Sequence, residues 1–221
     1  TFENLDTHTA GVGALAGTFL ALQEKGAHNI NLVSPTHYSF EAARAIREAK
    51  GHGLQVPVVY NSNGYDSPET LSAMEGLVDV YLPDLKYFDD EAAMRYSAAP
   101  KYFHHASRAI LEMSRKVGAP VFGEDGTISR GLIVRHLVLP GHAEDSVHLL
   151  KWFKDSLPEG TYLSLMAQYY PTHRAGEFPE INRTLRQEEY DRVLDAMYSL
   201  GLNHGFVQGL SSADSSYTPK F

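Results

Sequence analysis

The amino-acid sequence predicts an α/β protein in which parallel strands, covered by helices, form a partial TIM barrel. Segments with apolar residues at helical spacing alternate with short apolar strands, which is the pattern of repeated βαβ units. Several successive strands end in a polar cluster. A barrel places function at many strand ends at once, whereas a doubly wound sheet places it at one switch point. We therefore favour the barrel over the doubly wound sheet.

Six segments have the helical pattern, and several of their ends have recognisable signals. Gly26 stops the first segment, while Ser39 and Ser67 are expected to be N-caps of the second and third. Pro68, at the first helical position, supports the third. The expected helices are residues 12–25, 39–53, 67–75, 104–117, 144–157 and 186–201.

Six apolar runs between these segments are the expected strands. They are almost continuously apolar, as strands buried on both faces of a sheet must be. The residues GEDGT at 123–127 are expected to form a turn. We expect one domain over residues 1–210, followed by a tail at 211–221. The strands are expected at residues 28–37, 56–64, 78–83, 131–141, 161–171 and 205–210.

The composition is that of a globular protein with an excess of acidic residues. Of the 221 residues, 43% are hydrophobic and 21% are charged, which is enough for one sizeable core. The net charge of -8 argues against nucleic-acid or membrane-surface binding as the main function. We find neither a transmembrane run nor a signal-peptide pattern and expect a cytoplasmic location. The chain has 0 cysteines, which excludes disulfides and thiolate ligands from its own residues.

An acid and a base follow the third expected strand. Asp84 and Lys86 stand two residues apart in VDVYLPDLKYFDD, so in an extended chain both side chains point to one face. Such a pair is commonly a solvated ion pair that contributes little to stability. It is also the kind of charged pair that lines a binding site, and the neighbouring strands decide between these interpretations.

Two other strands add polar groups at their ends. The second strand ends in NSNG, which places Asn61 and Ser62 there, although Asn and Gly are also ordinary turn residues. Arg135 interrupts the apolar strand 131–141, where a buried anionic partner would stabilise it. These side chains are therefore candidates for the same site as the acid and base of the third strand.

One ligand could contact all of these groups. It would have a carboxylate for Lys86 or Arg135, and an ammonium for Asp84 with the oxygens of Asn61 and Ser62. It would also have a flat ring to lie against strand backbone and aromatic side chains. An amino acid joined to a nucleoside has all three parts, and S-adenosylmethionine is such a molecule.

Histidines and Lys86 suggest two other chemistries. Several of the 11 histidines lie near strand ends, and with Asp84 they would suit a metal-dependent hydrolase, but no H-x-H or H-E-x-x-H spacing occurs. A buried lysine can form a Schiff base, but an adjacent carboxylate would keep Lys86 protonated. The histidines near strand ends are His37, His136, His142 and His173.

The strand ends lie in five stretches, GAHNINLVSPTHY, PVVYNSNGYDS, VDVYLPDLKY, IVRHLVLPG and SLMAQYYPTHR. Together and in this order they resemble the radical S-adenosylmethionine family, in particular its pyruvate formate-lyase activating enzyme-like proteins. The resemblance extends over essentially the whole chain. It is closer to the branch with poorly defined substrates than to the activating enzymes themselves.

The resemblance implies a partial TIM barrel that binds S-adenosylmethionine across the carboxyl ends of its strands. The activating enzymes have S-G-G-E where this chain has Ser34-Pro35-Thr36-His37. They have Asp-Thr in place of Asn61-Ser62, so a monovalent cation site there loses a charge. No catalytic or metal-ligating residue is assigned. The implied cofactor-binding residues are Ser34, Thr36, Asn61, Ser62, Asp84, Lys86, Arg135, Leu137, Gln168 and His173.

The family also implies an iron–sulfur cluster. Its C-x-x-x-C-x-x-C motif, after the first barrel strand, holds a [4Fe–4S] cluster that reductively cleaves S-adenosylmethionine to a 5′-deoxyadenosyl radical for hydrogen abstraction. Because this chain has no cysteine, we expect a fragment whose parent protein carries the first strand and the cluster. The implied partners are a glycyl-radical enzyme or another protein substrate, and a reductant such as flavodoxin or ferredoxin. The alternatives are a cluster-free barrel that acts as a binding or scaffold subunit, and the His/Asp metal hydrolase.

Overall fold

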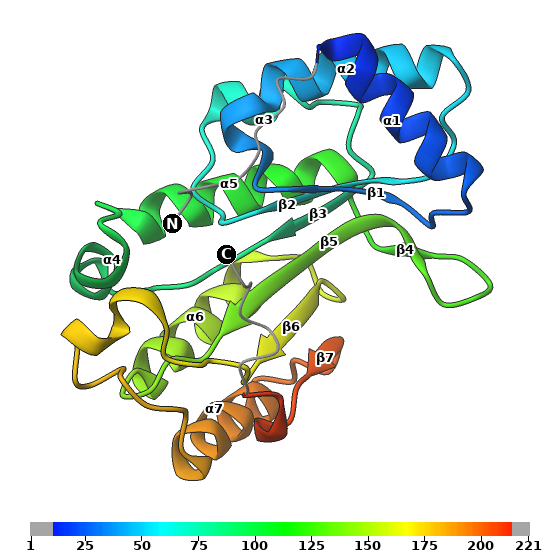
Figure 1. The fold of residues 1–221 in the computed structure, drawn as a ribbon. Coiled ribbons are helices and arrows are strands. Elements are labelled where there is room, and N and C mark those ends of the chain that lie inside the picture. Colours follow the sequence, from blue (N-terminus) through cyan, green and yellow to red (C-terminus); the bar gives the residue numbers. More distant parts are fainter. Residues whose placement is uncertain (1–10, 214–221) are drawn as a thin grey trace.

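The computed structural model describes residues 11–213, which form a curved sheet with helices along one side (Figure 1). The expected tail at 211–221 therefore lies mostly outside the described residues, and the boundary of the domain at residue 210 stays a prediction. The strands are β1 Ile30–Val33, β2 Val58–Ser62, β3 Val80–Pro83, β4 Val121–Phe122, β5 Ile128–Leu137, β6 Tyr162–Met166 and β7 Gly205–Val207.

Helices connect the strands. Each parallel strand is followed by at least one helix, as the alternating sequence pattern predicts. No helix within residues 11–213 combines the length and hydropathy needed to cross a membrane. The α-helices are α1 Val12–Glu24, α2 Ser39–Gly51, α3 Pro68–Ala73, α4 Asp90–Ser97, α5 Tyr102–Val117, α6 Ala143–Ser156 and α7 Gln187–Ser199. The 3-10 helices are η1 Pro35–Tyr38, η2 His173–Glu177 and η3 Leu210–Ser212.

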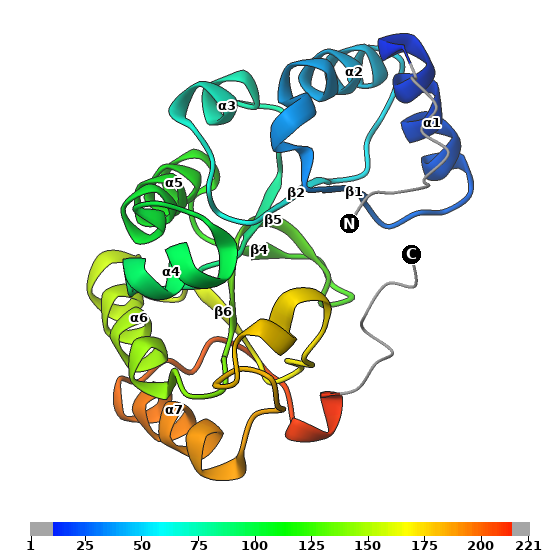
Figure 2. The same cartoon turned by 60° about the vertical axis from the view of Figure 1, so that its left-hand side comes forward.

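The order of the strands decides between the two architectures that the sequence allows. The parallel strands pair in the order β1-β2-β3-β5-β6-β7, so each lies beside the next parallel strand along the chain. A doubly wound sheet would instead reverse its order at a switch point. Figure 2 shows the helices in an arc outside these strands. The fold is the predicted α/β partial barrel.

The two faces of the sheet have different side chains because successive residues of a strand point to opposite sides. Toward the helices, Tyr60 of β2 and Tyr81 of β3 are paired in register and pack edge to face with ring centroids 5.6 Å apart. Val134 of β5 is buried in the same core. The next residues along β2 and β5, Asn61 and Arg135, point to the opposite, concave face. This alternation brings polar groups of separate strands to one side.

Three local expectations need correction. Ser67 caps α3 through a bond from the Thr70 amide, as predicted, but Ser39 is the first residue of α2 and the N-cap is Tyr38, without a side-chain cap. The sequence analysis missed α4, whose signal is an N-cap at Asp89 followed by two acids. It also missed β4, which pairs antiparallel with an early extension of β5 that begins at Ile128. The expected turn at 123–127 connects these two strands.

Candidate functional site

Four of the predicted polar residues meet at the carboxyl ends of three neighbouring strands. Nη2 of Arg135 in β5 forms an ion pair with Asp84 Oδ1 at 2.6 Å and donates a hydrogen bond to Asn61 Oδ1, near the end of β2, at 2.7 Å. Lys86 Nζ lies 3.5 Å from Asp84 Oδ2. We call Asn61, Asp84, Lys86 and Arg135 the strand-end cluster. Their proximity follows from the fold, while their role in binding a ligand stays a prediction.

The strand-end cluster has more cationic than anionic groups. Its one carboxylate, on Asp84, faces the two cations of Lys86 and Arg135, and the side chain of Arg135 is only 25% exposed. The Nε of Arg135 is buried and has no hydrogen-bond partner among residues 11–213. An anionic acceptor from a ligand would satisfy this donor and balance the charge.

Backbone contacts hold the ends of β2 and β3 together. Gly64 has φ +79°, and a Cβ there would lie 2.1 Å from the carbonyl oxygen of Asp84. The buried hydroxyl of Tyr102 is shared between the carbonyl oxygens of Asn63 at 2.9 Å and Asp84 at 3.0 Å, and it accepts the Lys86 amide at 3.1 Å. Burial raises the pKa of Tyr102, so the hydroxyl keeps its proton. Tyr102 is a positioning residue that the sequence analysis missed.

A buried carboxylate that was not predicted, Asp66, organises the turn after β2. Its Oδ1 accepts the hydroxyls of Thr36 and Tyr60, each at 2.8 Å, and its Oδ2 accepts that of Ser62 at 2.6 Å. Burial raises the pKa of Tyr60, and the negative charge of Asp66 raises it further, so this phenol stays neutral. The predicted ligand hydroxyls of Thr36 and Ser62 thus donate to the protein itself. Their observed contacts are structural.

A pocket of about 320 Å³ borders the strand-end cluster, and we call it the strand-end pocket. Five predicted residues line it: Asp84, Lys86, Arg135, Leu137 and Gln168. Three members of the strand-end cluster therefore provide its charged groups, and most of the other lining residues are apolar. The amide oxygen of Gln168 accepts from the side chain of a neighbouring glutamine at 2.9 Å. The remaining lining residues are Tyr87, Leu139, Met166 and Tyr169.

Like Thr36, Asn61 and Ser62, the last two predicted residues, Ser34 and His173, lie outside this pocket. Both are exposed and have left-handed backbone conformations, with φ 51° and 52°. The Ser34 amide donates to the carbonyl oxygen of Asn61 at 2.8 Å, which fixes the chain after β1 beside the cluster. His173 begins η2 and lines a smaller pocket of about 180 Å³. We call this smaller cavity the side pocket.

The histidines near the strand ends do not gather. His136 is 2% exposed and lies against α6, with Nδ1 2.7 Å from the Leu85 carbonyl oxygen and Nε2 2.8 Å from Ser146 Oγ. The Leu85 carbonyl accepts from Nδ1–H, so Nε2 accepts the serine hydroxyl. His142 Nε2 lies 2.9 Å from the hydroxyl of Tyr96. Among residues 11–213 no three His, Asp or Glu side chains are placed to hold a metal ion. The described residues thus contain no ligand set for the metal-hydrolase hypothesis.

The burial of His136 predicts a pH-dependent stability. Burial lowers its pKa, so the unfolded chain, with a histidine pKa of about 6.5, binds a proton that the folded chain does not. The contribution is therefore present above pH ~6.5 and lost as the pH falls below it. In urea unfolding between pH 8 and 5, we expect His136→Phe to reduce the slope below pH 6.5 by up to about 1.4 kcal/mol per pH unit. Equal slopes in both proteins would contradict this assignment.

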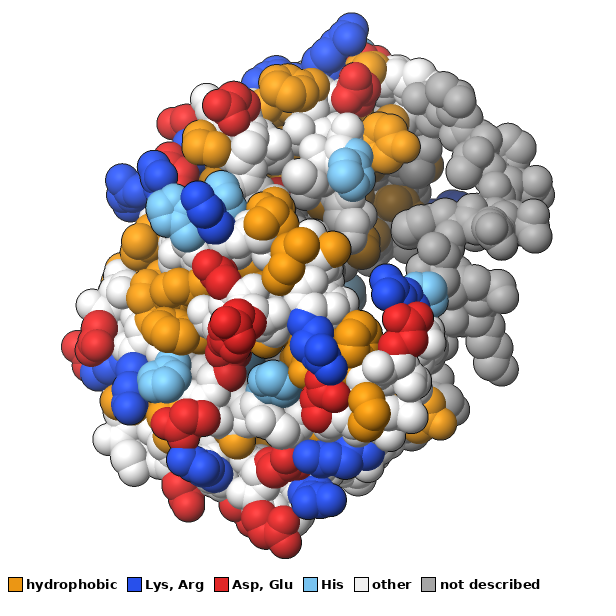
Figure 3. All heavy atoms as spheres, turned by 90° about the vertical axis from the view of Figure 1, so that its left-hand side faces the viewer, with side chains coloured by type: hydrophobic (Ala, Val, Ile, Leu, Met, Phe, Trp, Pro, Cys, Tyr) orange, Lys and Arg blue, Asp and Glu red, His pale blue; other side chains and the backbone are white. Residues whose placement is uncertain are grey.

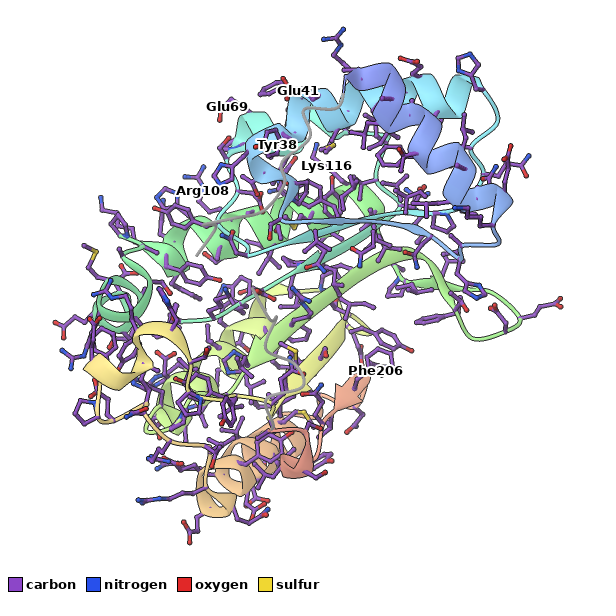
Figure 4. All side chains as sticks on the ribbon, in the orientation of Figure 1. Tyr38, Glu41, Glu69, Arg108, Lys116 and Phe206 are labelled. Carbon is purple, nitrogen blue, oxygen red and sulfur yellow. The ribbon has the colours of Figure 1, made fainter. Side chains whose placement is uncertain are left out.

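A larger cavity, of about 590 Å³, lies between α3 and α5 and shares no lining residue with the strand-end pocket. Figure 4 shows Arg108 and Lys116 on α5 facing this side. Its charges are largely neutralised within the protein, because Lys116 Nζ contacts Glu75 at 2.7 Å and Arg115 contacts Glu112 at 3.1 Å.

Figure 3, which views the side where α4 and η2 lie, shows acidic, basic and histidine side chains interspersed with hydrophobic ones. That face therefore has a mixed charge.

The residues of this chain do not fit an iron–sulfur cluster as ligands. The sequence contains 0 cysteines, and thiolates are the usual ligands of such clusters. The strand-end pocket, in contrast, has both charged and apolar lining residues, and the arginine that borders it has one buried donor, Nε, without a partner among residues 11–213.

Comparison with known proteins supports the fold more than the function. No family model matches the sequence. The structure is similar to the crystal structure of a domain of a pyruvate-formate lyase-activating enzyme from Bacteroides vulgatus, with a TM-score of 0.54, covering 82% of this chain and 98% of that domain. The α/β partial barrel of this chain therefore resembles the fold of that domain. At 14% sequence identity this likeness concerns the fold alone.

In sequence, the chain is similar to an uncharacterized protein of Methanocaldococcus jannaschii. The two are 32% identical over 140 residues, which is 63% of this chain and 37% of that protein. The match thus spans little more than a third of the length of this curated relative, whose own function is not described. The radical-enzyme function is consequently a proposal.

Proposed function

We propose that this chain binds S-adenosylmethionine in the strand-end pocket, as the barrel part of a radical enzyme of the pyruvate formate-lyase activating type. The observation that carries the proposal is the strand-end cluster beside a half-apolar pocket, on a fold that resembles a domain of such an enzyme. A zwitterion joined to a nucleoside would match the charged and the apolar lining residues of the pocket. Each part of the ligand has a counterpart among the described residues.

The proposed contacts follow from the free bonding capacity of the cluster. The cofactor carboxylate would accept from Arg135, whose Nε lacks a partner in the described chain, and from Lys86. The ammonium would donate to Asp84, which is now the ion-pair partner of Arg135, and to the side-chain oxygen of Asn61, which now accepts from Arg135. The adenosine would lie along Leu137 and the other apolar lining residues. Binding would thus exchange an internal ion pair for ligand contacts.

The chain itself would supply cofactor positioning. In radical enzymes of this type the cluster provides the electron that cleaves the cofactor, and its thiolates would have to come from residues outside this chain, which has 0 cysteines. A glycyl-radical enzyme is the proposed protein substrate, with flavodoxin or ferredoxin as reductant. These partners belong to the proposal for the whole protein.

Titration of the 221-residue chain with S-adenosylmethionine by calorimetry tests the proposal. We expect binding that Arg135→Met weakens about 10- to 100-fold, because a charge-assisted hydrogen bond contributes about 1.5–3 kcal/mol. The control Arg115→Met removes an arginine of α5 that is paired with Glu112 and should leave affinity unchanged. Thermal unfolding of each variant separates lost binding from lost folding. Absence of binding by the wild-type chain would refute the proposal.

A second candidate, a cluster-free binding or scaffold subunit, is favoured by the same 0 cysteines. In that case the strand-end ion pairs would hold neighbouring strands of the partial barrel together, and no nucleoside would bind there. The titration distinguishes the two candidates, since a scaffold is expected to give no binding heat with S-adenosylmethionine. In a scaffold, Arg135→Met is expected to change only the stability of the protein.

A further inference from the structure

The side pocket adjoins the strand-end pocket, and the two share the side chains of Tyr87, Leu139 and Tyr169 as a common wall. We propose that the side pocket is a subsite for an uncharged, apolar side group of a second ligand that binds beside the cofactor. The inference rests on the proposed function, because it takes the strand-end pocket as the cofactor site. It adds the class of substrate to that site.

The three tyrosines that line the side pocket present apolar ring surface to it, because their hydroxyls are hydrogen-bonded within the protein. The hydroxyl of Tyr87 bonds to Ser97 Oγ at 2.9 Å, and that of Tyr169 donates to a backbone carbonyl oxygen at 2.9 Å. The hydroxyl of Tyr96 donates to Glu180 Oε1 at 2.9 Å. All three polar ends are therefore engaged within the protein. The rings remain to contact a ligand, together with Leu139, Ala175, Phe178 and Ile181.

The charges around the side pocket are also engaged. Arg174 at its rim forms a fork with Glu177, with bonds of 2.7 to 3.1 Å. Arg95 binds Glu180 at 2.7 Å and lies 5.1 Å from the ring centre of Phe178. The hydrogen bond from Arg95 lowers the pKa of Glu180 to about 2, which keeps this pair charged. Thr172 and His173, which are both exposed, are the other polar lining residues. A charged side group that lies among the buried lining residues would have to break one of these ion pairs to find a charged partner.

The volume of the side pocket limits what can enter. At about 180 Å³ it is smaller than the ~300–1,000 Å³ of sites that enclose a whole small molecule. It is therefore suited to one side group, of about the size of a leucine side chain, while the rest of the ligand lies toward the strand-end pocket. Ala175 and Ile181 are both buried, and they line the side pocket but not the strand-end pocket. Substitutions at these two residues can therefore change the depth of the side pocket without altering the strand-end pocket.

Saturation-transfer NMR with the full chain and excess S-adenosylmethionine tests the subsite. The probes are N-acetyl-leucinamide and N-acetyl-asparaginamide, whose side chains have similar size and branching but opposite polarity. We expect the leucine probe to bind at least about tenfold more tightly, from the apolar surface it buries. Ala175→Leu, which fills the pocket, should reduce its binding at least about fivefold and leave S-adenosylmethionine affinity unchanged. The control Ala119→Leu, on an exposed loop, should change neither.

Each outcome has a defined meaning. Should Ala175→Leu fail to fold, Ile181→Ala, which enlarges the pocket, should shift the preference toward N-acetyl-phenylalaninamide. Equal binding of the two probes, or full binding of the leucine probe to Ala175→Leu, would overturn the inference and leave the cofactor proposal standing if S-adenosylmethionine still binds. Specific binding of the leucine probe without any S-adenosylmethionine binding would keep the subsite and refute the proposed function. Failure of both ligands to bind would refute both.

Discussion

Gly64→Ala is expected to lower the free energy of unfolding by about 3 kcal/mol and to disrupt the strand-end cluster. Gly64 has φ +79°, which alanine adopts at a cost, and the added methyl group would lie 2.1 Å from the carbonyl oxygen of Asp84. That oxygen belongs to a backbone that also bonds to β2 and to Tyr102, so it has little freedom to move. The displaced residue, Asp84, is the partner of Arg135.

Gly76 provides a matched control for this substitution. It has a similar φ of +70°, but no atom of residues 11–213 lies within 4 Å of where its Cβ would be. Gly76→Ala should therefore cost about 1 kcal/mol, from backbone conformation alone. Urea unfolding followed by circular dichroism measures both variants. Equal losses would show that the contact between Gly64 and Asp84 is not a constraint on the fold.

Asp66→Ala is expected to cost a similar amount, about 3 kcal/mol, because it leaves the buried hydroxyls of Tyr60 and Ser62 without their acceptor. The third donor, Thr36, is on η1 and would lose its tie to β2. We expect the segment after β1 to become more open to amide hydrogen exchange. Unfolding free energy and exchange rates are the two measurements.

Asp66→Asn separates the loss of the acceptor from the loss of the charge. The amide oxygen can still accept from Thr36 and Tyr60, and Ser62 Oγ, which already accepts the Gly64 amide, can accept from the new amide nitrogen. We expect a loss of about 1 kcal/mol. If the asparagine variant were as unstable as the alanine variant, the carboxylate charge would be the dominant contribution.

The strand-end cluster could be predicted because its geometry follows from local rules. Strand periodicity puts Asn61 and Arg135 on one face, and parallel strands bring their carboxyl ends to one edge. Arg135 also stands out as a charge in an otherwise apolar strand. Such signals are local in the sequence, and the parallel topology converts them into contacts.

The residues that hold this site in place could not be predicted in the same way. Asp66 precedes the helix cap Ser67, so in the sequence it looks like a turn residue rather than the acceptor of three hydroxyls. Tyr102 looks like part of the apolar face of a helix, and its role depends on backbone groups 16 to 39 residues away in the sequence. The inward bonds of Thr36 and Ser62 have the same origin. Tertiary hydrogen bonds of this kind have no period that a single sequence displays.

The contacts of Tyr102 bear on how such a site can diversify. Its hydroxyl bonds to backbone groups of Asn63, Asp84 and Lys86, and to none of their side chains. These hydrogen bonds therefore do not depend on which side chains these three positions carry. Over evolutionary time the chemistry of the edge can be exchanged residue by residue while its shape is inherited.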